Sequence, residues 1–150
     1  MCAGNICRSP AAEAAIREAA IEAGLEVDVD SAGTGSWHIG QPPHADSVAA
    51  GERSGLAIDG RARKVTVADF DRFDIIVAMD RANLRDLEAL APSKEALAKI
   101  RLFRTYDPET TIDEVPDPWG GQAAGYEETI RIVRAAARGL VAEIVAHSRP

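Results

Sequence analysis

Cysteine is scarce in this sequence, with two residues among 150, Cys2 and Cys7. That number is too small for the disulfide framework that holds many small secreted domains together. The three histidines, His38, His44 and His147, stand far apart and have no spacing typical of metal ligands, so we predict no metal site and no cofactor. Because both cysteines lie at the start of the chain, we look for their role in chemistry rather than in stability.

Long apolar runs are also missing. No segment approaches the roughly 20 apolar residues that span a bilayer, and the N-terminus lacks the pattern of a secretory signal. Basic residues are outnumbered, with 17 Lys and Arg against 24 Asp and Glu and a net charge of −7. This charge opposes broad binding to nucleic acid or to anionic membranes. We therefore expect a cytoplasmic protein that binds neither, with room for a local basic pocket.

The composition is that of a folded domain. Hydrophobic residues make up 46% of the chain and charged residues 27%, both close to globular averages. No repeat, linker or low-complexity tract interrupts the sequence, and its length suits one domain. We predict a single domain over residues 1–150.

Apolar periodicity predicts helices alternating with strands. We expect helices over residues 10–23, 44–54, 80–90 and from about 126 onward, strands over 26–30, 73–79 and 100–103, and a long loop over 104–126. Ser9 and Pro10 are typical of an N-cap and a first-turn proline. Strands that alternate with helices indicate an α/β domain with a mainly parallel sheet.

The residues that carry chemistry are concentrated at the N-terminus, where the chain reads CAGNICRSP from Cys2 onward. Five residues separate Cys2 from Arg8, which precedes a predicted helix, so the loop can wrap around one anion with backbone N–H groups pointing inward. The helix N-terminus and Arg8 favour the thiolate form of Cys2, and a guanidinium can hold two phosphoryl oxygens at once. We predict Cys2 as nucleophile and Arg8 as phosphate clamp. The predicted phosphate-binding residues are the rest of this loop: Ala3, Gly4, Asn5, Ile6, Cys7 and Ser9.

Two residues of the loop suit unusual backbone geometry. Gly4 allows a close approach or a positive φ, and Asn5 tolerates a left-handed conformation. The pattern C-x-G-N-x-C-R-S-P resembles the phosphate loop of the low-molecular-weight protein tyrosine phosphatases. Further segments resemble landmarks of that family in the same order, namely residues 30–33, the loop around Trp37, and residues 62–66, 73–76, 83–87 and 115–120.

This resemblance implies a three-layer α/β/α fold with a mainly parallel four-stranded sheet and a phosphate-binding loop at the N-terminus. It also implies hydrolysis of phosphotyrosine in phosphorylated proteins through a phosphocysteine intermediate, with phosphate or another oxyanion bound in the loop. The mechanism needs an acid to protonate the leaving oxygen, a contribution typically worth about 10²–10⁴-fold. By resemblance Asp117 is that acid, and Trp37 and Trp119 flank the mouth of the site as substrate-binding residues. Cys7, by the same resemblance, protects an oxidised Cys2 by forming a disulfide.

The sequence departs from the family at two places. A histidine that often braces the loop asparagine is replaced by Gly60, so we expect the bracing of Asn5 by Ser9 and Ser31 to lack one member. Family members also carry a hydrophobic strand immediately before the nucleophile, where this sequence has Met1. We therefore expect a three-stranded sheet with a groove at the position of the first strand, and a natural polypeptide that begins earlier than Met1.

Alternative functions stay open at this point. Protein-arginine phosphatases are similar but usually carry threonine at the position of Ile6, while they share a glycine at the position of Gly120. Ile6 therefore favours tyrosine and Gly120 favours arginine. Thioredoxin-coupled arsenate reductases need cysteines beyond Cys7, and this sequence has none. A non-catalytic phosphate-binding module would keep the loop without turning over a substrate.

Overall fold

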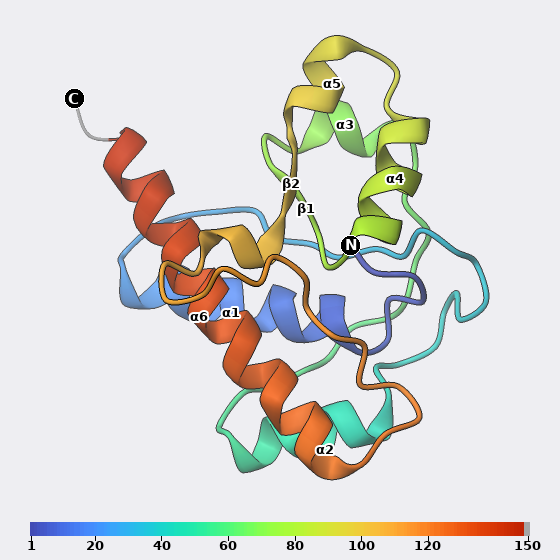
Figure 1. The fold of residues 1–150 in the computed structure, drawn as a ribbon, viewed down its shortest axis with the longest axis vertical. Helices are drawn as coiled ribbons and strands as arrows, with labels where there is room; N and C mark the ends of the chain where they lie inside the picture. The colour runs from blue at the N-terminus through green and yellow to red at the C-terminus, as the bar shows by residue number, and fades with distance from the viewer. Residues whose placement is uncertain (149–150) are drawn as a thin grey trace.

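Two short parallel strands separate two groups of helices in the computed structural model, which describes residues 1–148 (Figure 1). Strand β1 (Ile76–Ala78) pairs with β2 (Ile100–Leu102), with Ile76 opposite Ile100. The helices are α1 (Arg8–Glu22), α2 (Ala45–Arg53), α3 (Asp69–Arg72), α4 (Arg81–Leu90), α5 (Lys94–Ala98) and α6 (Ala123–Ser148), with a 3-10 helix η1 (Phe103–Tyr106) after β2. This order confirms the α/β class and the parallel pairing.

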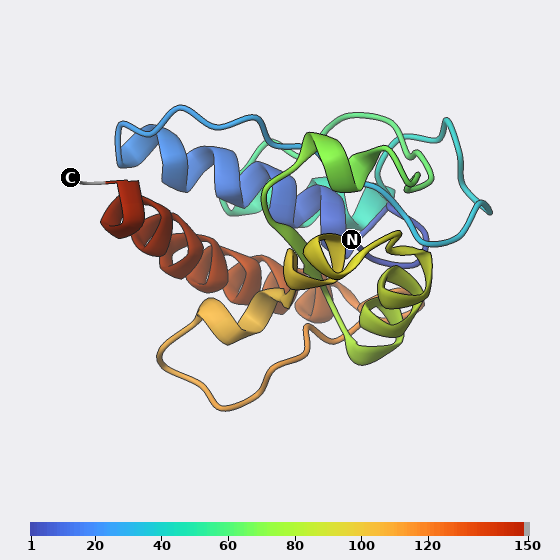
Figure 2. The same cartoon turned by 90° about the horizontal axis from the view of Figure 1, so that it is seen from above.

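The two groups of helices form separate layers. Figures 1 and 2 show α1, α2 and α6 on one side of the strands and α3, α4 and α5 on the other. The first layer is rich in alanine. Helices α1 and α6 pack against each other, and both bury alanines in the core that they share, namely Ala11, Ala15, Ala136 and Ala137. Side chains this small let two helix axes come close together. The second layer packs around the fully buried Phe70 and other apolar residues of α4, α5 and both strands.

Helix α1 begins at Arg8, two residues earlier than predicted. Cys7 is its N-cap and makes no side-chain capping bond. The hydroxyl of Ser9 does not cap the helix; it lies 3.0 Å from the Cys2 sulfur and accepts a hydrogen bond from the Asn5 amide at 2.8 Å. The prediction that Ser9 caps the helix is therefore wrong, because its hydroxyl contacts Cys2 and Asn5 of the loop. Pro10 still lies in the first turn, where its missing N–H costs nothing.

The predicted strand over residues 26–30 is absent from the structure, so the expected three-stranded sheet is wrong. In the part of the chain that the structure describes, the sheet has two strands, extended only by isolated parallel bridges from Gly33 to Cys2 and to Lys64. Residues 26–30 run alongside a cavity of about 420 Å³ that separates them from β1. This cavity is the expected groove. Without a neighbour across it, the segment has no ladder to join, and Val27 is left exposed.

Other differences are smaller. Helices α3 and α5 have four and five residues, too short to produce a periodic apolar pattern. Helix α6 begins at Ala123, within the predicted loop, and β1 is shorter than predicted. The Asp80 cap of α4 is confirmed as a full capping box with Asn83. Among residues 1–148, no helix combines the length and apolarity needed to cross a membrane.

The crossing of α6 with η1 yields a stability prediction. A Cβ added at Gly139 would overlap the Tyr106 carbonyl oxygen, whereas one added at Gly125 would meet Pro118 at an ordinary 3.9 Å. Helix propensity alone favours alanine over glycine by roughly 0.5–1 kcal/mol at both sites. We expect Gly139→Ala to destabilise the protein by about 1–3 kcal/mol in urea unfolding, because the backbones must separate. Gly125→Ala is the control and should be neutral or stabilising; an equal gain in both variants would contradict the close contact.

Candidate active site

The loop from Cys2 to Arg8 surrounds the sulfur of Cys2. Cys2 is 3% exposed, and the backbone N–H of Asn5 donates to its sulfur at 3.3 Å. The hydroxyl of Ser9 lies 3.0 Å from the same sulfur. When Cys2 is a thiolate, both groups can donate to it, so the first turn of α1 and the loop together stabilise negative charge at this atom.

Asn5 fixes the shape of the loop. It is the one non-glycine residue of residues 1–148 with a positive φ, at 58°. Its Nδ2 donates to the hydroxyls of Ser9 at 2.8 Å and Ser31 at 3.0 Å, and its Oδ1 accepts the backbone N–H of Arg63 at 3.1 Å. Two hydroxyls and the Arg63 backbone N–H thus brace Asn5, and Gly60 has no side chain to add the contact that the resemblance implies for a histidine there.

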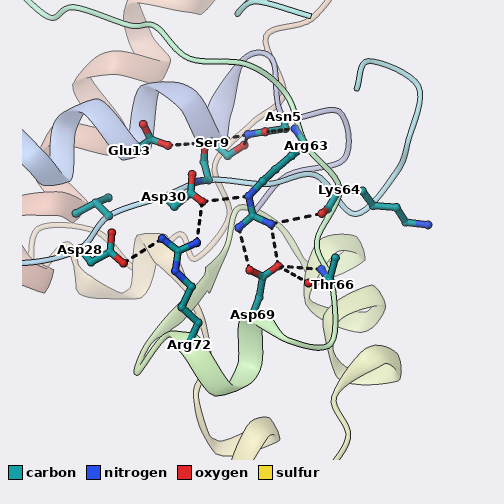
Figure 3. A network of polar contacts seen from close by, with 12 residues as sticks. Asn5, Ser9, Glu13, Asp28, Asp30, Arg63, Lys64, Thr66, Asp69 and Arg72 are labelled. Carbon is teal, nitrogen blue, oxygen red and sulfur yellow. Dashed lines mark hydrogen bonds and ion pairs between the residues drawn. The ribbon is translucent and has the colours of Figure 1, made fainter. Parts of the chain in front are cut away.

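The side chain of Arg63 anchors this brace (Figure 3). Its guanidinium donates to both carboxylate oxygens of Asp69, at 2.9 and 3.0 Å, and to Asp30 at 3.1 Å. The hydrogen bond that Arg63 donates to Asp69 raises the pKa of Arg63. Burial acts to raise the pKa of Asp69, but the hydrogen bonds from Arg63 and Thr66 outweigh it, and that pKa lies below its ordinary value. The pair therefore stays ionised at neutral pH and fixes the backbone that holds Asn5.

Neighbouring segments hold the backbone of the loop from outside. The carbonyl of Ala3 accepts from Gly35 at 2.9 Å, and that of Ile6 accepts from His44 at 2.8 Å. A Cβ on Gly4 would lie 2.9 Å from the His38 ring. Of the two predicted reasons for a glycine at position 4, the structure shows the close approach, here to the His38 ring, and no positive φ.

Arg8 is buried, and two fixed acceptors hold its guanidinium. Its Nη1 donates to Asp80 at 2.6 Å and to the carbonyl of Val115 at 3.0 Å, while Nη2 lies 3.7 Å from the carboxylate of Asp117. Burial acts to raise the pKa of Asp80, but the hydrogen bond and charge of Arg8, together with the backbone hydrogen bonds from Asn83 and Ala82, outweigh it, and the net shift is downward. Asp80 is thus an ionised partner that orients Arg8 and leaves Nε and Nη2 for an anion.

The loop after Val115 brings Asp117 to the site. Asp117 is half exposed, and its carboxylate accepts the backbone N–H of Trp119 at 3.1 Å. Trp37 and Trp119 are 71% and 62% exposed. No hydrogen bond or ring stacking in residues 1–148 joins either indole to the phosphate loop. The structure therefore brings together Cys2 with Arg8 and Asp117, and leaves the two tryptophans as exposed rings.

Comparison with known proteins agrees with this geometry. The family model for low molecular weight phosphotyrosine protein phosphatase matches residues 1–149. A low molecular weight protein-tyrosine-phosphatase of Streptomyces coelicolor is 44% identical over 96% of this chain and 90% of its own. Among solved structures, a protein tyrosine phosphatase from Entamoeba histolytica with Hepes in the active site has a TM-score of 0.94 at 34% identity, covering 99% of this chain and 96% of that one. YfkJ from Bacillus subtilis has a TM-score of 0.89 at 38% identity, covering 99% and 93%.

The chain belongs to the low molecular weight phosphotyrosine protein phosphatase family. It is accordingly a protein tyrosine phosphatase, an enzyme that hydrolyses phosphoric monoesters. The TM-scores also show that it has the fold of this family.

Cys7 occupies a different environment from Cys2 in this phosphatase. Both thiols are free and buried. Burial, with a smaller contribution from Asp117, raises the pKa of Cys7 to about 12, so this thiol is protonated at neutral pH. It lies next to Tyr126, whose ring stacks on His44 at 5.4 Å between centroids. These contacts make Cys7 a packing residue beneath the loop in the reduced enzyme.

Sequence reasoning missed three groups that position the site of the phosphatase: the Asp80 carboxylate, the Val115 carbonyl and the Arg63 backbone N–H. Asp80 was predicted only as a helix cap. Its place at the end of a buried strand was a usable signal, because such ends face the ligand side of a parallel sheet. Backbone groups carry no sequence signal of this kind.

The double role of Asp80 gives a prediction. Asparagine is as good an N-cap as aspartate, so Asp80→Asn keeps the start of α4 while removing the charge on Arg8. We expect inorganic phosphate to inhibit the variant about 10-fold more weakly, with little change in melting temperature, because Arg8 loses its fixed partner. Asp113→Asn, at an exposed ion pair with Arg81, is the control. Unchanged phosphate inhibition in Asp80→Asn would mean that Asp80 does not orient Arg8.

Proposed function

We propose that this phosphatase hydrolyses phosphotyrosine in proteins with Cys2 as nucleophile, Arg8 as phosphate clamp and Asp117 as acid and then base. One observation carries the proposal: three groups meet at this loop. They are the buried Cys2 sulfur with its two donors, the Arg8 guanidinium, which Asp80 holds through Nη1, and the half-exposed carboxylate of Asp117. These are the parts that a double displacement at phosphorus requires.

In the first step the Cys2 thiolate attacks phosphorus, and the bond to the tyrosyl oxygen breaks. Asp117, as the carboxylic acid, gives its proton to that oxygen, so that a neutral phenol leaves. Arg8 and the inward N–H groups of the loop hold the equatorial phosphoryl oxygens as charge redistributes. The half-exposed side chain of Asp117 supports this role, because the leaving group must reach it from solvent.

In the second step water attacks the phosphocysteine. Asp117, now a carboxylate, takes a proton from the water, the bond from phosphorus to sulfur breaks, and inorganic phosphate is released. The donors from Asn5 and Ser9 support the departing thiolate of Cys2. The cycle regenerates both starting forms, so it needs neither a metal nor a cofactor.

Substrate and anion binding follow from the same loop. We propose that Ala3, Gly4, Asn5, Ile6, Cys7 and Ser9 bind phosphate or another oxyanion, and that Trp37 and Trp119 flank the substrate ring. The relative from Entamoeba histolytica holds Hepes, a sulfonate, in its active site, which supports a tetrahedral oxyanion in this loop. The exposed indoles of Trp37 and Trp119 offer flat apolar surface to a phenyl ring.

We further propose that the enzyme acts in the cytoplasm on phosphorylated proteins. The mechanism needs Cys2 as a free thiol, and a second thiol lies in the same loop. A reducing compartment keeps both in this state.

The role of Asp117 predicts a dependence on the leaving group. Asp117→Asn should lower kcat about 10²–10³-fold for phenyl phosphate, whose leaving group needs a proton, and much less for an aryl phosphate with a good leaving group such as p-nitrophenyl phosphate. Asp113→Asn changes a carboxylate in the same loop and serves as control. The measurement is steady-state hydrolysis of both esters by both variants.

Two results would count against the proposal. Equal loss for both esters would remove Asp117 as the acid. Faster hydrolysis of phosphoarginine than of phosphotyrosine peptides would instead favour the protein-arginine phosphatase activity that Gly120 suggested.

A further inference from the structure

Helix α2 begins beside the phosphate loop, and a histidine is its N-cap. The imidazole Nδ1 of His44 accepts the backbone N–H of Asp46 at 3.1 Å. Because a backbone N–H can only donate, this Nδ1 carries a lone pair and the ring proton lies on Nε2. Serine, threonine, aspartate and asparagine are the usual residues at an N-cap. The histidine here therefore calls for an explanation from its other contacts.

The ring of His44 is held by a second helix. Figure 1 shows α2 packed across the first turns of α6. The imidazole stacks on the ring of Tyr126 in α6, with 5.4 Å between the centroids and 18° between the ring planes. Tyr126 is 2% exposed and belongs to the same core cluster as Cys7 of the phosphate loop. Tyr126 therefore fixes the plane of the imidazole and, with it, the direction of the Nδ1 lone pair.

The backbone of the same histidine holds the phosphate loop. The N–H of His44 donates to the carbonyl of Ile6 at 2.8 Å. A trans peptide unit directs its carbonyl and the following N–H to opposite sides, so a donor outside the loop that holds the Ile6 carbonyl turns the Cys7 N–H inward. In the first turn of α2, the buried hydroxyl of Ser47 donates to the Cys7 carbonyl at 3.5 Å, which acts on the N–H of Arg8 in the same way. The start of α2 thus orients two N–H groups of the loop.

We propose that His44 is a positioning residue for the phosphate loop: its neutral imidazole caps α2 and so fixes the backbone N–H that holds the Ile6 carbonyl. The cap and the hold on the loop are coupled directly, because one residue makes both contacts. Without the cap, the first turn of α2 loses a partner for one of its free N–H groups, and the His44 backbone is no longer fixed. The Cys7 N–H then spends less time aimed at a bound anion. This inference rests on the anion site of the proposed function, but not on the roles of Cys2 and Asp117.

The cap works only while the imidazole is neutral. A second proton goes to Nδ1, and the protonated ring has no lone pair for the Asp46 N–H. The carboxylate of Asp46 lies 3.8 Å from the same nitrogen and can then pair with it. The hold on Ile6 therefore weakens as the pH falls through the titration of this ring.

Groups from four segments surround the imidazole and its stacking partner. They are Asp46 on α2, Tyr126 and Glu127 on α6, Cys7 in the phosphate loop and Asp117 in the loop after Val115. Burial raises the pKa of Cys7 and of Tyr126 to about 12, so neither carries charge at neutral pH. Glu127 pairs with Arg53. Asp46 is therefore the carboxylate that competes with the cap once the ring is protonated.

The first test compares His44→Ala with His44→Asn. Both variants lose the stacked ring, but asparagine can still cap α2. In hydrolysis of p-nitrophenyl phosphate at about pH 8, we expect inorganic phosphate to inhibit the alanine variant about 5-fold more weakly than the asparagine variant. Ser93→Ala is the matched control, because it removes a cap of the same kind from α5, whose Ser93 hydroxyl accepts from Ala96 at 3.1 Å. It should lower the melting temperature by about 2–4 °C and leave phosphate inhibition unchanged.

The second test uses pH as the readout. The ratio of phosphate inhibition constants between the unchanged enzyme and His44→Asn cancels the titrations of phosphate, Cys2 and Asp117, which both proteins share. We expect this ratio to change about 5-fold as the pH falls, along the same curve as the His44 ring signal in NMR, because the protonated histidine then behaves like the alanine variant. Tyr126→Phe keeps the stacked ring and should follow the unchanged enzyme.

Three results would overturn the role of His44. They are equal phosphate inhibition of the alanine and asparagine variants, a loss in Ser93→Ala as large as in His44→Ala, and a constant ratio while the His44 ring titrates. Failure of the proposed function looks different. If phosphate does not inhibit the unchanged enzyme, the anion site itself is wrong, and if Cys2→Ser still turns over substrate, the nucleophile is wrong.

Discussion

The side-chain amide of Asn5 is the contact on which the site depends. A left-handed residue in the middle of a tight loop has few ways to be stable. Here three hydrogen bonds hold it: the Asn5 amide donates to two hydroxyls, and its oxygen accepts from one backbone N–H. The resulting turn aims the Asn5 N–H at the Cys2 sulfur. The third partner, Arg63, is itself fixed by Asp69, so an ion pair outside the site sets the position of an atom inside it.

Charged side chains around the phosphate loop are also held by fixed contacts. The chain carries a net charge of −7, yet the loop presents Arg8 and inward N–H groups to one anion. Asp80 compensates the charge of the buried Arg8 guanidinium. It bonds only Nη1, so Nε and Nη2 stay available for an anion. The carboxylate of Asp117 lies 3.7 Å from the Arg8 guanidinium, close enough for the two charges to interact. Its side chain is also exposed, so a leaving group can reach it. A local basic site on an acidic protein is thus explained by a few fixed contacts.

Much of this could be predicted from the sequence, for identifiable reasons. The sequence pattern of the loop was a strong signal because Gly4, Asn5 and Arg8 each meet a separate demand of anion binding. In the structure, the Asn5 N–H and the Ser9 hydroxyl lie at the Cys2 sulfur, and Arg8 lies beside Asp117. The parallel pairing of β1 with β2 followed from apolar runs that alternate with helices. Residues 26–30 alternate polar and apolar side chains as a strand does, yet they form no strand. A strand needs a neighbouring strand to hydrogen-bond with, and a cavity lies beside these residues instead. Partners such as the Val115 carbonyl and the Arg63 N–H could not be predicted, since any residue supplies them.

The central claim is that Cys2, and not the second thiol of the loop, takes the phosphoryl group. The most direct measurement is rapid acid quench of the Asp117→Asn enzyme during turnover of p-nitrophenyl phosphate, followed by mass spectrometric mapping of the N-terminal peptide. The account predicts one phosphoryl group on Cys2, retained in Cys7→Ser and lost in Cys2→Ser. A phosphoryl group on Cys7, or turnover by Cys2→Ser, would contradict it.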